Sequence, residues 1–169
     1  MNSPAKHSPI TLVLAIACFA GIPALNGAEP TSTTESNKQI IQASFDRWRT
    51  GTGGPFELLA AEADWTITGH SIVARKYESR DAFMESVIRP FNARLSKPLV
   101  PAIRILYGEG DTVIALFDAE AMAHDGRPYR NTYAWFMKMR DGRIVSVTAF
   151  FDSLAFDDFW KRVEPRQKR

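Results

Sequence analysis

Asp152 is the side chain of this sequence whose position best suits acid–base chemistry. It ends a run of alternating residues and shares a predicted strand face with Thr148 and Phe150. A carboxylate placed among aromatic rings is poorly hydrated, which favours its taking up a proton and suits it to act as a general base. Alternatively, Asp152 caps a following helix by accepting hydrogen bonds from the backbone N–H groups of Leu154 or Ala155. The two roles can coexist.

Tyr133 and Asn131 offer a phenol and an amide two residues apart, so both project from one face of a predicted strand. Two such donors can stabilise an enolate or another oxyanion. The alternative is that Tyr133 is ordinary core, as most aromatic stripes in strands are. His70 follows another predicted strand and can serve as a proton shuttle at the mouth of a cavity. The candidate catalytic residues are therefore Asp152, Tyr133, Asn131 and His70.

The residues expected to bind a substrate are mainly aromatic, which is typical of a pocket for a small apolar molecule. They are Trp65, Tyr77, Phe91, Glu120, Trp135 and Phe150. Glu120 shares its face with Asp118 among apolar neighbours. This pattern fits a carboxylate that lines the cavity, and it fits equally a sheet face turned to solvent.

Metal chemistry is not indicated. His70 and His124 are the only histidines after residue 28, and no regularly spaced carboxylates accompany them. The sequence also contains no Gly-rich phosphate loop and no Gly-x-Ser-x-Gly turn around a nucleophile. We predict that the protein uses no metal and no cofactor.

Three long antiparallel strands between residues 112 and 152 must position most of these side chains. Asp-Gly pairs at 125–126 and 141–142 predict the two tight turns between them. In the middle strand, alternation places six residues on one face, namely Tyr129, Asn131, Tyr133, Trp135, Met137 and Met139. In the last strand it groups Ile144, Ser146, Thr148, Phe150 and Asp152, opposite Val145, Val147, Ala149 and Phe151.

Helices are expected on both sides of this stretch. The pattern Ser36-x-x-Gln39 predicts the start of a helix that ends at Gly51–Gly54 and whose apolar face carries Ile41, Phe45 and Trp48. The remaining expected elements are a short helix over 55–63, a strand over 64–69, a helix from Ser79 through Leu95 with a kink or break near Arg89 caused by Pro90, a turn flanked by Pro98 and Pro101, a strand over 100–107, and a terminal helix that buries Leu154, Phe156, Phe159 and Trp160. Helices followed by an antiparallel sheet make an α+β fold.

The run from Asp125 to Trp135, with Asp141-Gly142-Arg143-Ile144 and Phe151-Asp152-Ser153, resembles SnoaL-like, ketosteroid-isomerase-like proteins of the nuclear transport factor two-like superfamily. Trp65 with Gly69, and the segment 89–95, fit the same pattern. The resemblance implies a cone-shaped curved antiparallel sheet wrapped by N-terminal helices over a pocket, in a domain spanning 37–162. It also implies an acidic residue at position 152 that faces the cavity, and homodimers formed sheet to sheet.

This resemblance does not fix the reaction, because the family includes isomerases, cyclases, hydratases, hydrolases and non-enzymatic domains. We expect an exported domain that binds a small hydrophobic molecule and performs cofactor-free isomerisation, cyclisation or hydration on it. The alternative is a non-catalytic module for ligand binding or dimerisation.

The N-terminus has the features of a secretory signal peptide over residues 1–28. Lys6 and His7 precede an apolar run over 10–20, which is too short to span a bilayer, and small residues follow up to Ala28. A lipoprotein signal ending at Cys18 is the less favoured alternative. We therefore expect a periplasmic or secreted protein without stable membrane insertion, and without cysteine once the signal is removed.

Composition is that of one globular domain. Of 169 residues, 45% are apolar and 24% are charged, and the formal net charge is +2. The basic residues are dispersed, so nucleic-acid binding is not predicted. Residues 29–36 are expected to form a linker and 163–169 a basic tail.

Overall fold

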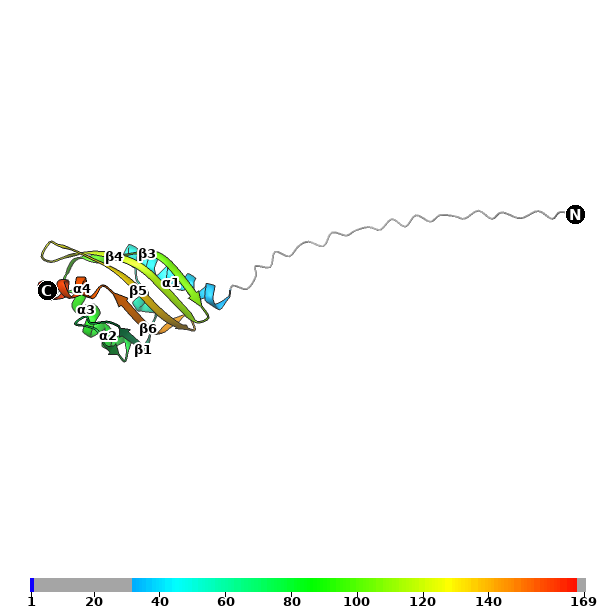
Figure 1. Ribbon diagram of the computed structural model, residues 1–169, viewed down its shortest axis with the longest axis horizontal. Helices are drawn as coiled ribbons and strands as arrows, with labels where there is room; N and C mark the ends of the chain where they lie inside the picture. The colour runs from blue at the N-terminus through cyan, green and yellow to red at the C-terminus, as the bar shows by residue number, and fades with distance from the viewer. Residues whose placement is uncertain (2–31, 167–169) are drawn as a thin grey trace. The chain divides into compact units, whose positions relative to one another are not determined.

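The computed structural model describes Met1 and residues 32–166 (Figure 1). Apart from Met1, the predicted signal peptide over 1–28, including Cys18, lies outside the described residues. The same holds for residues 29–31 of the predicted linker and 167–169 of the predicted basic tail. The predicted linker is shorter than expected, because residues 33–36 already belong to the first helix.

A curved six-stranded sheet forms the body of the fold, with the strand order β2-β1-β6-β5-β4-β3. The strands are β1 (Leu59–Ile67), β2 (Lys76–Tyr77), β3 (Leu95–Glu109), β4 (Thr112–Ala123), β5 (Pro128–Arg140) and β6 (Arg143–Phe151). The α+β prediction is confirmed, but β1 and β6 pair in parallel, so the sheet is mixed rather than antiparallel. A hairpin turn forces two strands that follow each other in the chain to be antiparallel. β1 and β6 are separated in the chain by all the other strands, so no hairpin sets their relative direction.

The helical segments pack against this sheet and against one another. They are α1 (Thr33–Thr50), the 3₁₀ turn η1 (Pro55–Leu58), α2 (Arg80–Phe83), the π turn η2 (Met84–Ile88), α3 (Arg89–Asn92) and α4 (Ser153–Arg162). Helix α1 runs along β3 and β4, α2 contacts β1, and α4 contacts β5 (Figure 1). Among the described residues, no helix is both long enough and apolar enough to cross a membrane.

Helix α1 begins one turn earlier than predicted. Ser32 is its N-cap and accepts a hydrogen bond from the backbone N–H of Glu35 at 3.2 Å. The sequence Ser32-x-x-Glu35 is itself a capping-box pattern, so the choice of Ser36 passed over an equally good signal. The predicted end is confirmed, because Gly51 closes the helix with a φ of 74°.

The short helix expected over residues 55–63 is wrong beyond Leu58. The 3₁₀ turn ends there and β1 begins at Leu59, which pairs with Ile144 of β6. The alanine-rich segment has good intrinsic helix propensity, but the edge of a buried sheet overrides it. The predicted strand therefore starts five residues earlier than residue 64.

The kink or break expected near Arg89 takes the form of a π turn, and the helical stretch continues through Pro90 as α3. Ser79 caps α2 by accepting from the N–H of Ala82, as expected. The backbone then widens into a π turn, in which the N–H of Arg89 reaches back to the carbonyl of Met84. Pro90, the next residue, has no N–H with which to continue the helical hydrogen bonds, so the irregular turn lies directly before the proline.

Strand β3 runs through the positions where a turn was expected. Pro98 and Pro101 both lie within it, and the register shifts around them between Leu95, Lys97 and Val100. Proline is tolerated here because β3 is the last strand of the sheet and pairs only with β4.

The alternation predicted for β5 is confirmed, and that for β6 is confirmed from Ser146 to Phe151 but wrong for Ile144, which lies on the buried face with Val147 and Ala149. Strand β5 buries the whole predicted face from Tyr129 to Met139. In β6, Ile144 pairs with Met139 but Ser146 pairs with Lys138, so Val145 is an extra residue in a β-bulge. The bulge reverses the alternation that follows it, which turns Val147 and Ala149 inward.

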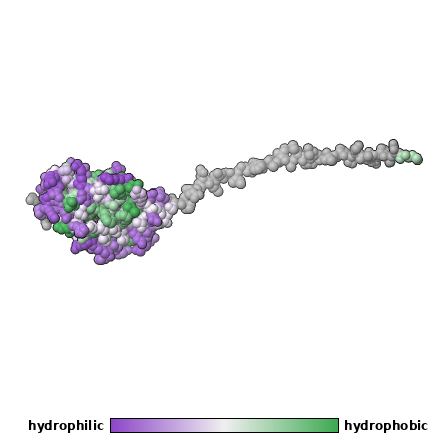
Figure 2. All heavy atoms as spheres, viewed as in Figure 1, coloured by the Kyte–Doolittle hydropathy of each residue, from purple (hydrophilic) through white to green (hydrophobic). Residues whose placement is uncertain are grey.

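The outer face of the sheet leaves several large apolar side chains exposed. They include Ile105, Tyr107, Phe136 and Phe150. Phe136 and Phe150 pack edge to face at 5.8 Å between ring centroids. Figure 2, in the same view as Figure 1, shows hydrophobic surface gathered over the strands inside a hydrophilic rim.

Candidate functional site

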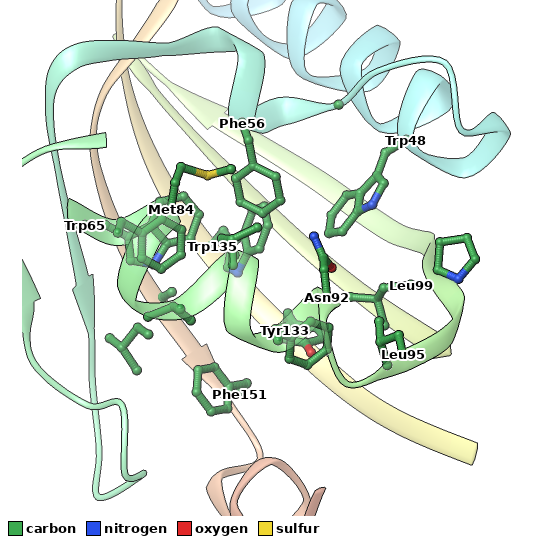
Figure 3. Close-up of a pocket in the computed structure, with 18 of the residues that line it drawn as sticks. Trp48, Phe56, Trp65, Met84, Asn92, Leu95, Leu99, Tyr133, Trp135 and Phe151 are labelled. Atoms are coloured by element: carbon green, nitrogen blue, oxygen red, sulfur yellow. The ribbon is translucent and has the colours of Figure 1, made fainter. Parts of the chain in front are cut away.

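A cavity of about 630 Å³ opens between the concave face of the sheet and the helical segments that cover it (Figure 3). The end of α1, the segment 53–57, the helical stretch 83–92 and the start of β3 surround it, and β1, β5 and β6 form its floor. Its lining is mainly apolar: Trp48, Phe56, Trp65, Ile67, Phe83, Met84, Val87, Ile88, Phe91, Leu95, Pro98, Leu99, Trp135, Ala149, Phe151 and Phe156.

Interlocking aromatic rings make up much of the wall. Trp65 stacks on Phe83 with 4.1 Å between ring centroids, and Trp135 meets Trp65 edge to face at 4.9 Å. Trp48 stacks on Trp135 at 5.8 Å. Each ring is held by its neighbours, so the pocket is a preformed cavity rather than one that a ligand must open. The N–H of Trp65 is buried and has no hydrogen-bond partner in residues 32–166.

A short chain of hydrogen bonds ends at the pocket. The hydroxyl groups of Tyr133 and Tyr129 are 2.7 Å apart, and the amide nitrogen of Asn131 donates to the Tyr129 oxygen at 3.0 Å. The same amide nitrogen donates to the carbonyl of Asp152 at 3.0 Å, and the amide oxygen of Asn131 accepts from the Asp152 N–H at 2.9 Å. Of these residues, only Tyr133 lines the pocket.

Burial keeps both phenols protonated. It raises the pKa of Tyr129 to about 12 and raises the pKa of Tyr133 well above its ordinary value, because a phenolate would lose its hydration there. Tyr133 is therefore a neutral hydrogen-bond donor or acceptor towards the cavity, and not a base. Asn131 is fully occupied by its partners, so the predicted role as an oxyanion donor beside Tyr133 does not fit its geometry.

Asp152 lies outside the pocket lining. Its side chain is exposed and accepts hydrogen bonds from the N–H groups of Leu154 at 2.9 Å and Ala155 at 3.2 Å, which makes it the N-cap of α4. This is the capping alternative that the sequence left open. The aromatic surroundings expected for the carboxylate are missing because the bulge in β6 turns Phe150 to the outer face.

Glu120 and His70 also lie away from the cavity. Glu120 is exposed on the outer sheet face, where it forms an ion pair with Arg130 at 2.8 Å. His70 is exposed in the turn that follows β1. Neither residue is part of the lining, so the structure does not bring them together with Tyr133.

The remaining predicted binding residues lie in or behind the pocket wall. Trp65, Phe91 and Trp135 line the cavity directly. Tyr77 supports the wall from behind: its ring packs edge to face on Phe83, and its hydroxyl donates to the carbonyl of Val73 at 2.8 Å.

Several residues that line the pocket were not predicted from the sequence to belong to the site. Trp48 was expected only as part of the apolar face of α1, and Phe56 and Glu57 lie in a segment expected to be helical. Glu57 is the one carboxylate that lines the pocket in the described part of the chain, and its side chain is exposed at the mouth. No histidine, lysine or arginine of that part lines it.

Residues 32–166 offer no cluster of three or more His, Cys, Asp or Glu side chains that could hold a metal ion.

Comparisons with known proteins agree with this architecture. The model of the SnoaL-like domain family matches residues 41–147. An NTF2-like protein from Burkholderia thailandensis E264 is 20% identical with a TM-score of 0.60, over 73% of this chain and 95% of its own. TerC, crystallised with polyporic acid, is 19% identical with a TM-score of 0.59, over 74% and 98%. A protein named as a SnoaL-like polyketide cyclase, from Jannaschia sp. CCS1, is 16% identical with a TM-score of 0.59, over 80% and 99%.

At these identities the structural likeness shows the fold alone. The comparison with curated protein sequences gave no match. The family model, however, covers well over half of the 169 residues. This chain belongs to the SnoaL-like domain family.

Proposed function

We propose that this domain binds a small, mainly apolar molecule in the cavity beneath α2 and α3. The observation that carries the proposal is the cavity itself, about 630 Å³ with walls of stacked aromatic rings and one buried phenol. This volume lies in the range of small-molecule sites, and apolar walls with a few polar groups are their usual composition. TerC, which shares the fold, was co-crystallised with polyporic acid, which is in keeping with the proposal.

Fluorene, a flat tricyclic hydrocarbon, is a suitable probe, because three tryptophans of the wall would report its arrival by a change in fluorescence. Ala149 lies on the cavity floor opposite Trp135, so Ala149→Leu places a larger side chain in the space for the ligand. We expect this substitution to weaken fluorene binding at least tenfold. Ala134→Leu, on the outer face of β5, is the matched control and should change the affinity less than twofold. Equal affinities in the two variants would overturn the proposal.

Acid–base catalysis is a second candidate function, favoured by one observation. Glu57 and the neutral phenol of Tyr133 line the same cavity, so a proton acceptor and a hydrogen-bond donor face one ligand. A molecule that co-purifies with the protein would serve as the trial substrate. Glu57→Gln should then reduce its conversion by roughly 10²- to 10⁴-fold while its binding stays unchanged. Equal conversion by the variant and the parent would leave binding as the only function.

We also propose that two copies associate through the outer sheet face. The apolar side chains of Phe136 and Phe150 lie exposed at its centre, and the ion pairs Arg104–Asp118 and Arg130–Glu120 lie beside them. An apolar centre with a charged rim is the usual composition of a protein interface. The area expected for such a dimer is about 800 Å² per partner.

Export is proposed from the N-terminal sequence alone, through its basic start, apolar run and small residues up to Ala28. The intact mass of the protein recovered outside the cytoplasm should correspond to a chain that begins near Glu29. A chain that retains Met1, or one that carries lipid on Cys18, would contradict cleavage at this site.

A further inference from the structure

Beside the phenol and the indoles described above, three polar side chains line the pocket, namely Glu57, Asn92 and Ser96. The Ser96 hydroxyl directs its hydrogen to the carbonyl groups of Met122 at 3.1 Å and Ala123 at 3.0 Å, so towards the cavity it can only accept. The carboxylate of Glu57 is also an acceptor only, whereas the amide of Asn92 can accept and donate. Neither Glu57 nor Asn92 forms a side-chain hydrogen bond with any residue of 32–166. These side chains therefore offer a ligand mainly acceptors.

The Glu57 carboxylate lies next to aromatic rings at the mouth of the pocket. A Cβ added to Gly53 would come within 2.8 Å of one of its oxygens, and a Cβ added to Gly54 would meet the Cβ of Trp48 at 3.4 Å. The carboxylate and the Trp48 side chain thus lie against consecutive residues of one loop. Phe56 packs edge to face on Trp48, with 5.6 Å between ring centroids. A negative charge and two aromatic rings therefore meet at the entrance.

The opposite end of the cavity is apolar. Ile67 pairs there with Ala149 across β1 and β6, and Phe151 packs on Phe156 with 4.9 Å between ring centroids. Figure 3 shows Trp48 on one side of the cavity and Phe151 on the other. A ligand that fits both ends has an apolar body and a polar group at the mouth.

Glu57 supplies the one formal charge of the lining in the described part of the chain. Arg47 lies on the other side of Gly53, where an added Cβ would meet its Nε at 3.3 Å. Arg47 does not line the cavity, and no ion pair joins it to Glu57 in the region that the structure describes. The carboxylate is therefore left to a cation that enters from outside.

We infer that the pocket takes an apolar amine, whose hydrocarbon body fills the aromatic cavity and whose ammonium group binds Glu57 at the mouth. An ammonium group carries three donors and no acceptor, which suits an entrance that offers acceptors. The faces of Trp48 and Phe56 attract positive charge as well. Glu57 also determines specificity, because it repels a ligand that carries a carboxylate. This inference rests on the proposed function of the pocket as a ligand site.

Three probes that share the fluorene body test the inference. At pH 7, 9-(aminomethyl)fluorene is a cation, 9-fluorenemethanol is neutral and fluorene-9-carboxylic acid is an anion. We expect the wild-type protein to bind the amine about tenfold more tightly than the alcohol, the combined worth of an exposed ion pair and a cation–π contact. The acid should bind more weakly than the alcohol. Added salt should reduce the preference for the amine, because it screens exposed charges.

Glu57→Gln should reduce the preference for the amine to about threefold or less, which leaves the cation–π contact alone. Its affinity for the alcohol should change less than twofold, which shows that the cavity is intact. Glu109→Gln is the matched control: Glu109 ends β3, is exposed and does not line the pocket. It removes the same charge and should leave the preference unchanged. The selective loss of amine affinity also distinguishes this role from general-base catalysis, in which Glu57→Gln leaves substrate binding unchanged.

Arg47→Gln tests the other charge at the entrance. It should strengthen the preference for the amine, because it removes a competing cation from beside Glu57. Tighter binding of the acid than of the alcohol, abolished in Arg47→Gln, would show that Arg47 sets the charge preference and would overturn the inference. Equal binding of amine and alcohol, or a preference that persists in Glu57→Gln, would also overturn it while leaving the proposed function intact. Failure of fluorene and all three probes to bind would overturn the proposed function and this inference together.

Discussion

Asn131 and Asp152 are joined by two hydrogen bonds, in which the side-chain amide of one closes on the backbone of the other. The contact joins the first part of β5 to the N-cap residue of α4, 21 positions along the chain. The amide nitrogen of Asn131 has one further hydrogen, and with it donates a hydrogen bond to the hydroxyl oxygen of Tyr129. The same residue therefore fixes the end of the sheet and the hydrogen bonds that lead to the pocket.

Asn131→Ala should lower the free energy of unfolding by about 2–4 kcal/mol, because it removes three hydrogen bonds and leaves buried partners without replacements. Urea denaturation measures this directly. Thr132→Ala is the matched control, because its hydroxyl donates to Asp118 on the exposed outer face. It should cost less than about 1 kcal/mol. Equal losses in the two variants would contradict the structural role of Asn131.

Asp152 should act on stability and not on ligand binding. Asn caps helices as well as Asp does, so Asp152→Asn should leave stability nearly unchanged, whereas Asp152→Ala should cost about 1 kcal/mol. Both variants should bind fluorene as the wild type does. A tenfold lower affinity for fluorene in Asp152→Asn would show instead that Asp152 belongs to the binding site, as predicted from the sequence.

Stability should fall at high pH because of the buried tyrosines. Burial raises the pKa of Tyr129 to about 12 in the folded protein and raises the pKa of Tyr133 well above its ordinary value, whereas in the unfolded chain both lie near 10. The folded state therefore keeps protons that the unfolded state loses. Their contribution is fully present below pH 10 and is lost as the pH rises towards 12 and beyond.

Urea denaturation at pH 9 and pH 11 measures this decline. Tyr129→Phe should make the decline shallower, because the residue that replaces Tyr129 cannot ionise. A wild-type protein whose unfolding free energy is the same at both pH values would show that the phenols ionise equally in the folded and unfolded states.

Phe136→Lys should convert the proposed dimer to a monomer, because a charge at the centre of the apolar outer face would be desolvated on association. Light scattering during size-exclusion chromatography measures the mass. Leu154→Lys is the matched control: Leu154 is 84% exposed on α4 and lies off the sheet. A wild-type protein that is monomeric at high concentration refutes the dimer, and a dimer that persists in Phe136→Lys places the interface elsewhere.

The sequence predicted the fold well where a local pattern determines it. The alternation of β5, the break at Pro90 and the stop at Gly51 all follow from short-range chemistry. The bulge at Val145 does not follow from short-range chemistry, because Phe150 and Phe151 are both aromatic and the sequence pattern allows either to face inward. One extra residue then moved Phe150 out of the predicted pocket and left Asp152 as a cap.

The site was predictable only in part, for the same reason. Trp65, Trp135 and Tyr133 are inward residues of strands, so alternation identified them. Trp48 and Glu57 line the cavity because α1 and η1 pack against the sheet beside it. No local sequence pattern predicts this packing. The partners of Asn131 are likewise brought together by tertiary packing.

The central claim, that this pocket is the ligand site, is tested most directly by the indole N–H signals of the four tryptophans in an ¹H–¹⁵N spectrum. Trp48, Trp65 and Trp135 line the cavity, whereas Trp160 of α4 does not. On titration with fluorene, the first three signals should shift together with one saturable curve while the Trp160 signal stays in place. Three unmoved signals from the pocket, or a shift of Trp160 alone, would contradict the account.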